Sequence, residues 1–248
     1  MIQDLNLLRG RDIKITDGLY LRQPSLGEIA DYKIEEQDEG YGEFAYMSML
    51  STFICTPFDI IAQLDKEGYD FTEITSYQLF IAMREHINVK DTKILFGDFD
   101  FSKMRLVVNG NSVELRSDTV TINEAVYQNL ADCVRTINSI SPPTFKGVND
   151  EYTKRKMIEY AYDELEFAKR SKPKSILKTM VSRATNHPYF KYNLTDVWDM
   201  KVYAFYDAIK SINIVESSNQ LSMGAYSGNL DLSKINKNEF NWLREVKD

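Results

Sequence analysis

The sequence contains few of the residues from which common catalytic and metal sites are built. Cysteine occurs twice in 248 residues, and His86 and His187 are the only histidines. Two distant histidines cannot form a local HExxH zinc motif, and two cysteines are too few for a disulfide framework. The glycine motifs GxxxxGK[ST] and GxGxxG and the hydrolase motif GxSxG are also missing. We therefore expect no resident cofactor, no metal site and no enzymatic activity.

Long hydrophobic runs are missing too. The most apolar window, residues 44–58, is shorter than the roughly 20 residues of a membrane-spanning helix, and polar residues and Pro57 interrupt it. The N-terminal residues carry Asp4 before any basic residue and show no apolar segment of a secretory signal. We expect a soluble intracellular protein in which Cys55 and Cys133 are small core residues.

Charge is divided unevenly along the chain. Residues 1–148 hold 14 basic and 23 acidic side chains, a net charge of −9, whereas residues 149–248 hold 16 and 14, a net charge of +2. Between them, Pro142 and Pro143 interrupt any helix. This pattern predicts an acidic α+β module over residues 1–140 and a mainly helical, aromatic-rich module over residues 149–248.

Turn and capping signals predict the elements of the first module. Asp17-Gly18 and Asn109-Gly110 lie between short β-forming runs and are typical of hairpins. Ser25 and Glu28 have capping-box spacing before a short helix. Apolar spacing predicts further helices over residues 43–55, 58–66, 76–86 and 123–140. The first three of these are expected to form a helical cluster.

The helix predicted over residues 43–55 has an apolar face of its own. Phe44, Met47, Leu50 and Ile54 recur at three- and four-residue spacing. This spacing is typical of the buried face of an amphipathic helix.

The second module reads as three helices and a tail. Lys, Glu, Ala and Leu favour helices over residues 151–170 and 175–185. Thr195 is the expected cap of a last long helix whose apolar face begins at Trp198, and the residues after Ser217 are expected to be extended. The fold class is therefore α+β, predominantly α-helical with two small β-hairpins.

Two charged segments have a chemical alternative. In a strand, Asp98 and Asp100 would share one face, and such a pair can hold a divalent cation, although a polar strand face explains it more simply. The stretch Lys154 to Arg183 contains nine basic and four acidic residues and could contact nucleic-acid phosphates. The acidic total charge favours a solvated helix face instead.

Three segments resemble a known family. They are Gln23-Pro24-Ser25-Leu26-Gly27-Glu28-Ile29, residues 94–101 (ILFGDFDF), and Val197-Trp198-Asp199-Met200 through Ala204-Phe205. Together they are similar to products of the morphogenesis region of tailed bacteriophages of Gram-positive hosts. The resemblance implies a role in tail or baseplate assembly, or as an assembly chaperone, in the host cytoplasm or in the virion. The acidic run at residues 35–39 is longer than in the family pattern, so its role is left open.

These observations together favour a binding protein over an enzyme. Without catalytic motifs, and with aromatic residues at 12% of the chain, protein–protein contact is the simplest activity. We expect a non-catalytic tail or baseplate assembly factor or minor virion component, with self-association left open. The expected contact residues are Trp198, Tyr203, Phe205, Tyr206 and Trp242. The alternatives are a nucleic-acid-binding protein that uses residues 154–183 and a metal-dependent enzyme at Asp98 and Asp100.

Overall fold

Helices make up most of the chain, and two small antiparallel sheets complete it. The computed structural model describes residues 4–33, 42–110, 112–141, 148, 150–171, 174–228, 230 and 232–244. The helices are α1 Asp4–Leu8, α2 Leu26–Ala30, α3 Gly42–Ile54, α4 Ile61–Lys66, α5 Ser76–Met83, α6 Val89–Phe96, α7 Glu124–Ile137, α8 Glu151–Arg170, α9 Ile176–Thr185 and α10 Val202–Tyr226. The strands are β1 Ile13–Thr16, β2 Leu19–Leu21, β3 Arg105–Asn109, β4 Ser112–Arg116 and β5 Thr121–Ile122. The predicted fold class is confirmed.

Two predicted features lie outside the described residues: the acidic run at residues 35–39 and the Pro142-Pro143 boundary. Among the helices that are described, none is long and apolar enough to span a membrane.

Both predicted hairpins are present. Strand β1 pairs antiparallel with β2, with Ile13 opposite Leu21. Strand β3 pairs with β4 from Arg105 opposite Arg116 to Asn109 opposite Ser112. Strand β5, which the sequence pattern did not predict, adds a short third strand beside β4.

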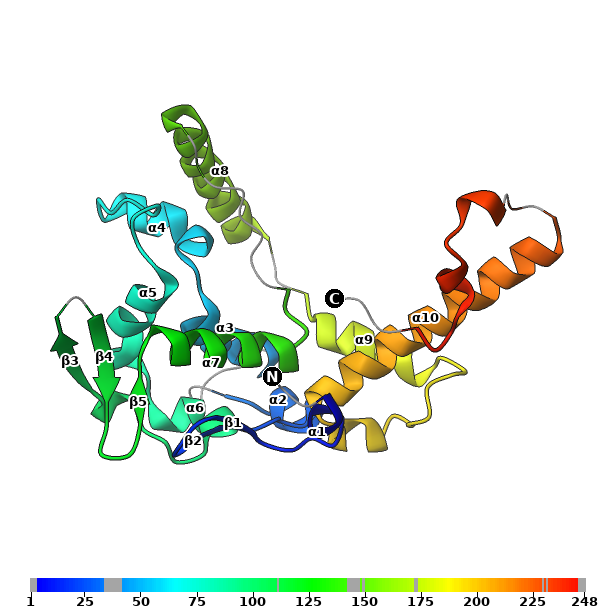
Figure 1. Ribbon diagram of the computed structural model, residues 1–248, viewed down its shortest axis with the longest axis horizontal. Helices are drawn as coiled ribbons and strands as arrows, with labels where there is room; N and C mark the ends of the chain where they lie inside the picture. Colours follow the sequence, from blue (N-terminus) through cyan, green and yellow to red (C-terminus); the bar gives the residue numbers. More distant parts are fainter. Residues whose placement is uncertain are drawn as a thin grey trace.

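A cluster of aromatic rings forms the centre of the main core. The Phe53 ring of α3 lies 4.9 Å from Phe96 and 5.3 Å from Phe101, measured between ring centroids. Phe80 of α5 stacks on Tyr127 of α7 at 5.0 Å. Figure 1 shows α3, α5 and α7 side by side at this point, with β1, β2 and α6 below them. These rings bury large apolar surfaces and hold the central helices together.

Helix α3 buries a different face from the one expected. Its buried side chains include Tyr46, Met49, Leu50 and Phe53, whereas Met47 is exposed. The helix is apolar on nearly all sides, so spacing alone cannot select the face, and large aromatic partners decide it. The Tyr46 hydroxyl donates to Asn138 Oδ1 at 2.9 Å, which fixes this face toward α7.

The segment that carries Asp98 and Asp100 is not a strand. Residues 89–96 form α6, and Gly97 ends that helix with φ of +60°, a conformation that favours glycine. The turn that follows returns Phe101 to the core beside Phe96. The expectation of two aspartates on one strand face is therefore wrong.

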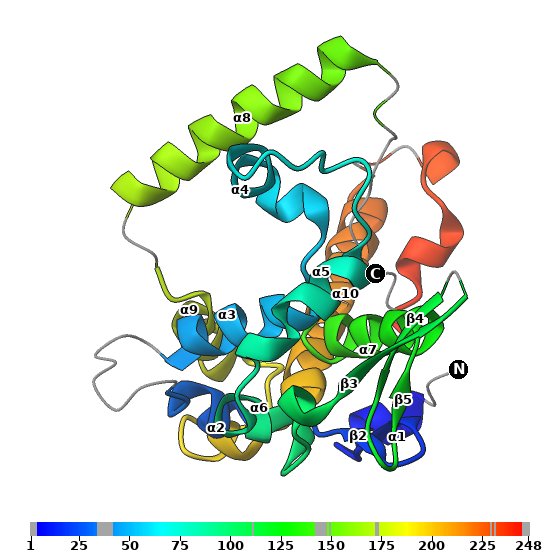
Figure 2. The same ribbon diagram turned by 90° about the vertical axis from the view of Figure 1, so that its left-hand side faces the viewer.

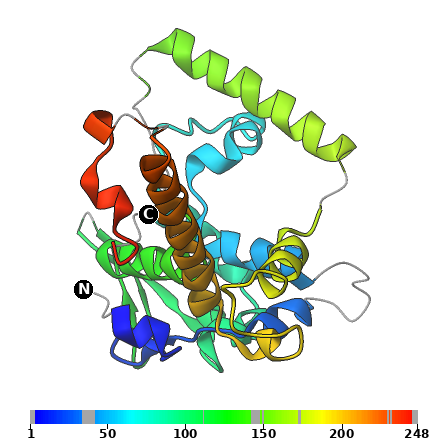
Figure 3. The ribbon, with the colours of Figure 1, turned by 90° about the vertical axis from the view of Figure 1, so that its right-hand side faces the viewer.

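The last long helix begins later and ends later than expected. Thr195 makes no side-chain capping bond and precedes a short 3-10 turn, η4, at Asp196–Asp199. Helix α10 starts at Val202 and continues past Ser217 to Tyr226. The chain then folds back along α10, where Ser218 Oγ donates to the Phe240 carbonyl at 2.5 Å (Figure 3). This cover accounts for the burial of Ser218.

Packing crosses the predicted module division. One hydrophobic cluster combines residues of the first range, such as Leu50 and Leu130, with Val181 of α9 and Phe205 of α10. A second, smaller cluster joins Ile61 and Leu64 of α4 to the partly buried Met157, Ile158 and Ala161 of α8. Both ranges therefore share cores, and the division at residues 140–149 stays a prediction.

Gly42 allows helix α3 to start against the end of α2. A Cβ atom at this position would lie 2.4 Å from the Ala30 carbonyl oxygen and 2.5 Å from that of Ile29. These are backbone atoms, so a rotamer change cannot relieve the overlap.

We expect Gly42→Ala to lower the free energy of unfolding by about 1–3 kcal/mol, because the helices must separate. Urea denaturation measures this change. Gly68→Ala is the control, because a Cβ atom at Gly68 would meet no other atom but the backbone has φ of +81°. This change should lower the free energy of unfolding by about 1–2 kcal/mol through backbone strain alone. A Gly42→Ala protein as stable as wild type would disprove the close approach.

Candidate functional site

The three segments that carry the family resemblance meet around α2. Backbone hydrogen bonds join them: the Leu26 amide donates to the Met200 carbonyl at 2.9 Å, and the Val202 amide donates to Pro24 at 3.0 Å. On the other side, the Arg22 amide donates to the Leu95 carbonyl at 2.7 Å. Segments up to about 175 residues apart in sequence are thus fixed against one another by main-chain bonds, which hold independently of side-chain identity.

Side chains reinforce this junction. Ser25 and Glu28 form the predicted capping box, with the Ser25 amide donating to Glu28 Oε2 at 2.7 Å and the Glu28 amide donating to Ser25 Oγ at 3.2 Å. The Glu28 carboxylate also pairs with Arg22 at 3.1 Å and Lys201 at 3.6 Å. Partial burial alone would raise the pKa of Glu28, but the Ser25 amide, Lys201 and Arg22 outweigh it and hold that pKa below its ordinary value.

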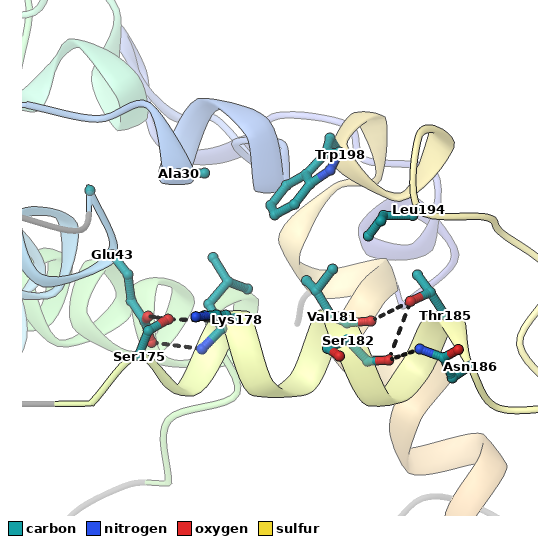
Figure 4. Close-up of a pocket in the computed structure, with 12 residues that line it drawn as sticks. Ala30, Glu43, Ser175, Lys178, Val181, Ser182, Thr185, Asn186, Leu194 and Trp198 are labelled. Carbon is teal, nitrogen blue, oxygen red and sulfur yellow. Dashed lines mark hydrogen bonds between the residues drawn. The ribbon is translucent and has the colours of Figure 1, made fainter.

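A pocket of about 360 Å³ lies next to this junction. Figure 4 shows Trp198 and Leu194 on one side of it, the side chains of α9 on the other, and Ala30 and Glu43 at one end. The apolar part of the wall comes from Ala30, Leu177, Val181, Leu194 and Trp198. Its size and largely apolar lining suit a single large side chain of a partner.

The α9 wall of the pocket is held by Glu43. The carboxylate of Glu43 accepts hydrogen bonds from Ser175 Oγ at 2.5 Å and from the Leu177 amide at 2.9 Å (Figure 4). It also accepts one from the Ile176 amide at 3.1 Å. Helix α9 has no acidic residue in its own first turn. Glu43 therefore supplies from α3 the negative charge that a helix N-terminus favours.

Exposed basic side chains occur on and just before α9. Lys174, Lys178 and Arg183 are exposed, and Lys178 alone of the three lines the pocket. Within the described part of the chain, none of the three forms an ion pair. A carboxylate-bearing ligand could therefore add a favourable charge contact at Lys178.

The structure separates the five expected contact residues. Trp198 lines the pocket, while Tyr203 and Tyr206 are half-buried against the main core. Phe205 is fully buried in that core, so its role in this conformation is to hold α10 in place. Trp242 is 60% exposed and belongs to the segment that follows the fold-back along α10, not to the pocket wall.

Sequence reasoning missed Glu43, Leu194 and α9 as parts of this site. The missing acidic residue in the first turn of α9 was an available signal that a carboxylate comes from elsewhere. Nothing in the sequence showed that α3 would provide it.

The candidate chemical groups are engaged in local contacts. Asp98 pairs with Lys93 at 3.1 Å, and Asp100 accepts from the Ser102 amide at 3.1 Å and pairs with Lys103 at 3.1 Å. In the described ranges, no group of three or more His, Cys, Asp or Glu side chains could hold a metal ion.

The thiols are at least partly buried, and the second histidine contacts a carboxylate. Burial raises the pKa of both the Cys55 and the Cys133 thiols to about 11, which disfavours the reactive thiolate. His187 Nε2 lies 2.8 Å from Glu216 Oε1.

The basic stretch from Lys154 to Arg183 does not form one continuous patch. On α8, Lys154 pairs with Asp70, Lys156 with Glu159 and Arg170 with Glu166. These carboxylates neutralise much of the positive charge that phosphate binding would need.

We expect Glu43→Gln to lower the free energy of unfolding by about 1–2 kcal/mol, because the helix N-terminus loses a charged acceptor. A double-mutant cycle with Ser175→Ala, read by urea denaturation, measures the coupling. Additive losses would show that the Glu43–Ser175 contact carries no energy.

The lowered pKa of Glu28 predicts an acid-dependent contribution to stability. A carboxyl group whose pKa is lower in the folded state stabilises fully above its ordinary value of 4.5, and this stabilisation is lost as the pH falls through the folded value. Glu28→Gln should therefore be less stable than wild type at pH 7, and the difference in urea midpoint should shrink below pH 4.5. A pH-independent difference would contradict the assignment.

Comparison with known proteins links the C-terminal part of the chain to one family. Residues 169–247 match the family model described as the second domain of YomV. Neither the curated proteins nor the solved structures contain a significant match to the chain. YomV is a phage-region protein of Bacillus, so the match supports the phage-related part of the resemblance. The matched residues include α9, Leu194 and Trp198, which supply most of the pocket wall.

Proposed function

We propose that this chain is a non-catalytic phage protein of the host cytoplasm that acts in tail or baseplate assembly by binding another protein at the Trp198 pocket. The observation that carries the proposal is the pocket itself: an apolar wall of Trp198, Leu194 and Val181 with the exposed Lys178 beside it. The match of residues 169–247 to a phage-related domain supports the phage setting.

The pocket is suited to an anchor side chain. Leu194 is 60% exposed at its edge, and Ile176 at the start of α9 is 66% exposed. Apolar side chains that stay in solvent around an apolar hollow gain free energy when a partner covers them. Binding sites in protein interfaces concentrate their energy in such desolvated pockets, often with tryptophan in the wall.

Lys178 restricts the partner's chemistry. Because this pocket residue lacks an ion-pair partner within the described residues, a partner segment with Asp or Glu beside its apolar anchor fits best. Opposite charges also speed association and exclude basic partners. We infer that the partner presents a Leu, Met or Phe side chain flanked by acidic residues.

The proposal is tested by co-expressing the chain with each tail and baseplate protein of its phage in turn. If a protein co-purifies with the wild-type chain, Leu194→Asp should abolish the co-purification, because binding would bury a charge in the pocket. Lys178→Glu should lower the affinity for that protein at least tenfold. Both side chains are exposed, so both variants should fold, which circular dichroism checks.

Val108→Asp is the matched control, since this side chain is 65% exposed on β3 and distant from the pocket wall. It should leave binding unchanged. Binding that survives Leu194→Asp and Lys178→Glu would overturn the pocket as the binding site.

Mass spectrometry of purified virions distinguishes two forms of the proposal. A minor virion component is present in the particle, whereas an assembly factor is absent from it. Detection of the chain in virions would exclude a purely transient role.

A further inference from the structure

Within the described part of the chain, helix α8 is attached to the rest of the protein along one side only. Figures 2 and 3 show it as the outermost helix, lying across α4, with no described helix or strand on its far side. Met157, Ile158 and Ala161 pack toward α4, while Lys154 pairs with Asp70 and Tyr162 donates to Asp65 Oδ2 at 3.0 Å. None of its 20 residues is buried.

The opposite side of α8 carries a stripe of aromatic residues. At about 100° per residue, Tyr152, Lys156, Tyr160, Asp163 and Phe167 share the face that points away from α4. Tyr152 is 64% exposed, Tyr160 71% and Phe167 73%. Three large rings held in solvent along one helix face are typical of an interaction surface.

The order of residues on this face is self-complementary when reversed. Tyr152 and Phe167 lie equally far from the midpoint between residues 159 and 160, and so do Lys156 and Asp163. An antiparallel copy of α8 would therefore place Tyr152 against Phe167, Lys156 against Asp163, and the two Tyr160 rings next to each other.

The wider charge pattern of α8 favours the same arrangement. Up to residue 159 it carries Lys154, Arg155 and Lys156 against two glutamates, and after that it carries Asp163, Glu164 and Glu166 against two basic residues, so the two parts have net charges of +1 and −1. On the outward face, a parallel copy would bring Lys156 against Lys156 and Asp163 against Asp163. An antiparallel copy instead brings Lys156, which also pairs with Glu159 of its own helix, against Asp163.

We propose that the outward face of α8 is a two-fold interface at which a second copy of this chain binds with its own α8 antiparallel. Such a contact uses the same patch on both copies and closes on itself, so it gives a dimer and not a filament. One helix from each copy buries less than the roughly 1,200 Å² of a standard interface, so the dimer should dissociate on dilution. This proposal does not depend on the Trp198 pocket.

Sedimentation equilibrium of the full chain across a range of concentrations tests the proposal. Wild type should show a reversible monomer–dimer equilibrium, and Tyr160→Asp should abolish it because two carboxylates would meet at the axis. Lys156→Glu and Asp163→Lys should each weaken dimerisation at least tenfold, since each places like charges against each other twice.

Charge reversal distinguishes this interface from any other. The double variant Lys156→Glu/Asp163→Lys restores both pairs and should dimerise about as well as wild type. An equimolar mixture of the two single variants should also form a heterodimer, because both of its contacts are then complementary. Lys169→Glu, an exposed change elsewhere on α8, is the matched control and should have no effect.

Circular dichroism confirms that each variant keeps its helix content. A wild-type chain that stays monomeric at high concentration would overturn the proposal. A dimer that tolerates Tyr160→Asp would place self-association on another face and would also overturn the proposal. The same holds if the double variant does not restore the dimerisation that the single charge reversals weaken.

Discussion

The rest of the structure depends on the main-chain hydrogen bonds around α2. The Leu26 amide donates to the Met200 carbonyl, and the Val202 amide donates to the Pro24 carbonyl. The Arg22 amide donates to the Leu95 carbonyl. These bonds join the segment that follows the N-terminal hairpin, the end of α6 and the start of α10 at one place. A buried backbone group that loses its partner costs free energy, so the junction resists local opening. The pocket exists because Trp198 is held on one side of this junction.

The junction also brings together the three short segments that carry the resemblance. The segments at residues 23–29, 94–101 and 197–205 contain a capping box, a glycine turn and a 3-10 turn. Each is a local device that ends or begins a helix at a set position. Together they set the approach of three distant parts of the chain, which composition or periodicity alone would not reveal.

Local signals predicted local structure well and failed where tertiary packing decides. The turns at Asp17-Gly18 and Asn109-Gly110 and the cap at Ser25 are encoded by neighbouring residues, and all formed as predicted. The buried face of α3 and the course of α10 past Ser217 depend on partners far away in sequence. Trp198 was predicted as a contact residue, yet Glu43 was not, because its role comes from the N-terminus of α9, more than 130 residues later.

The residues matched to the YomV second domain do not form the pocket on their own. Residues 169–247 supply Trp198, Leu194 and α9, but the end wall of Ala30 and the carboxylate of Glu43 come from α2 and the start of α3. The α9 and α10 side chains Val181 and Phe205 also share a core with residues of the N-terminal part. The matched region therefore needs the first part of this chain both to bury its apolar side chains and to complete the pocket. Helix α8 ends where the match begins and packs on α4, so its outward face can serve a different contact from the pocket.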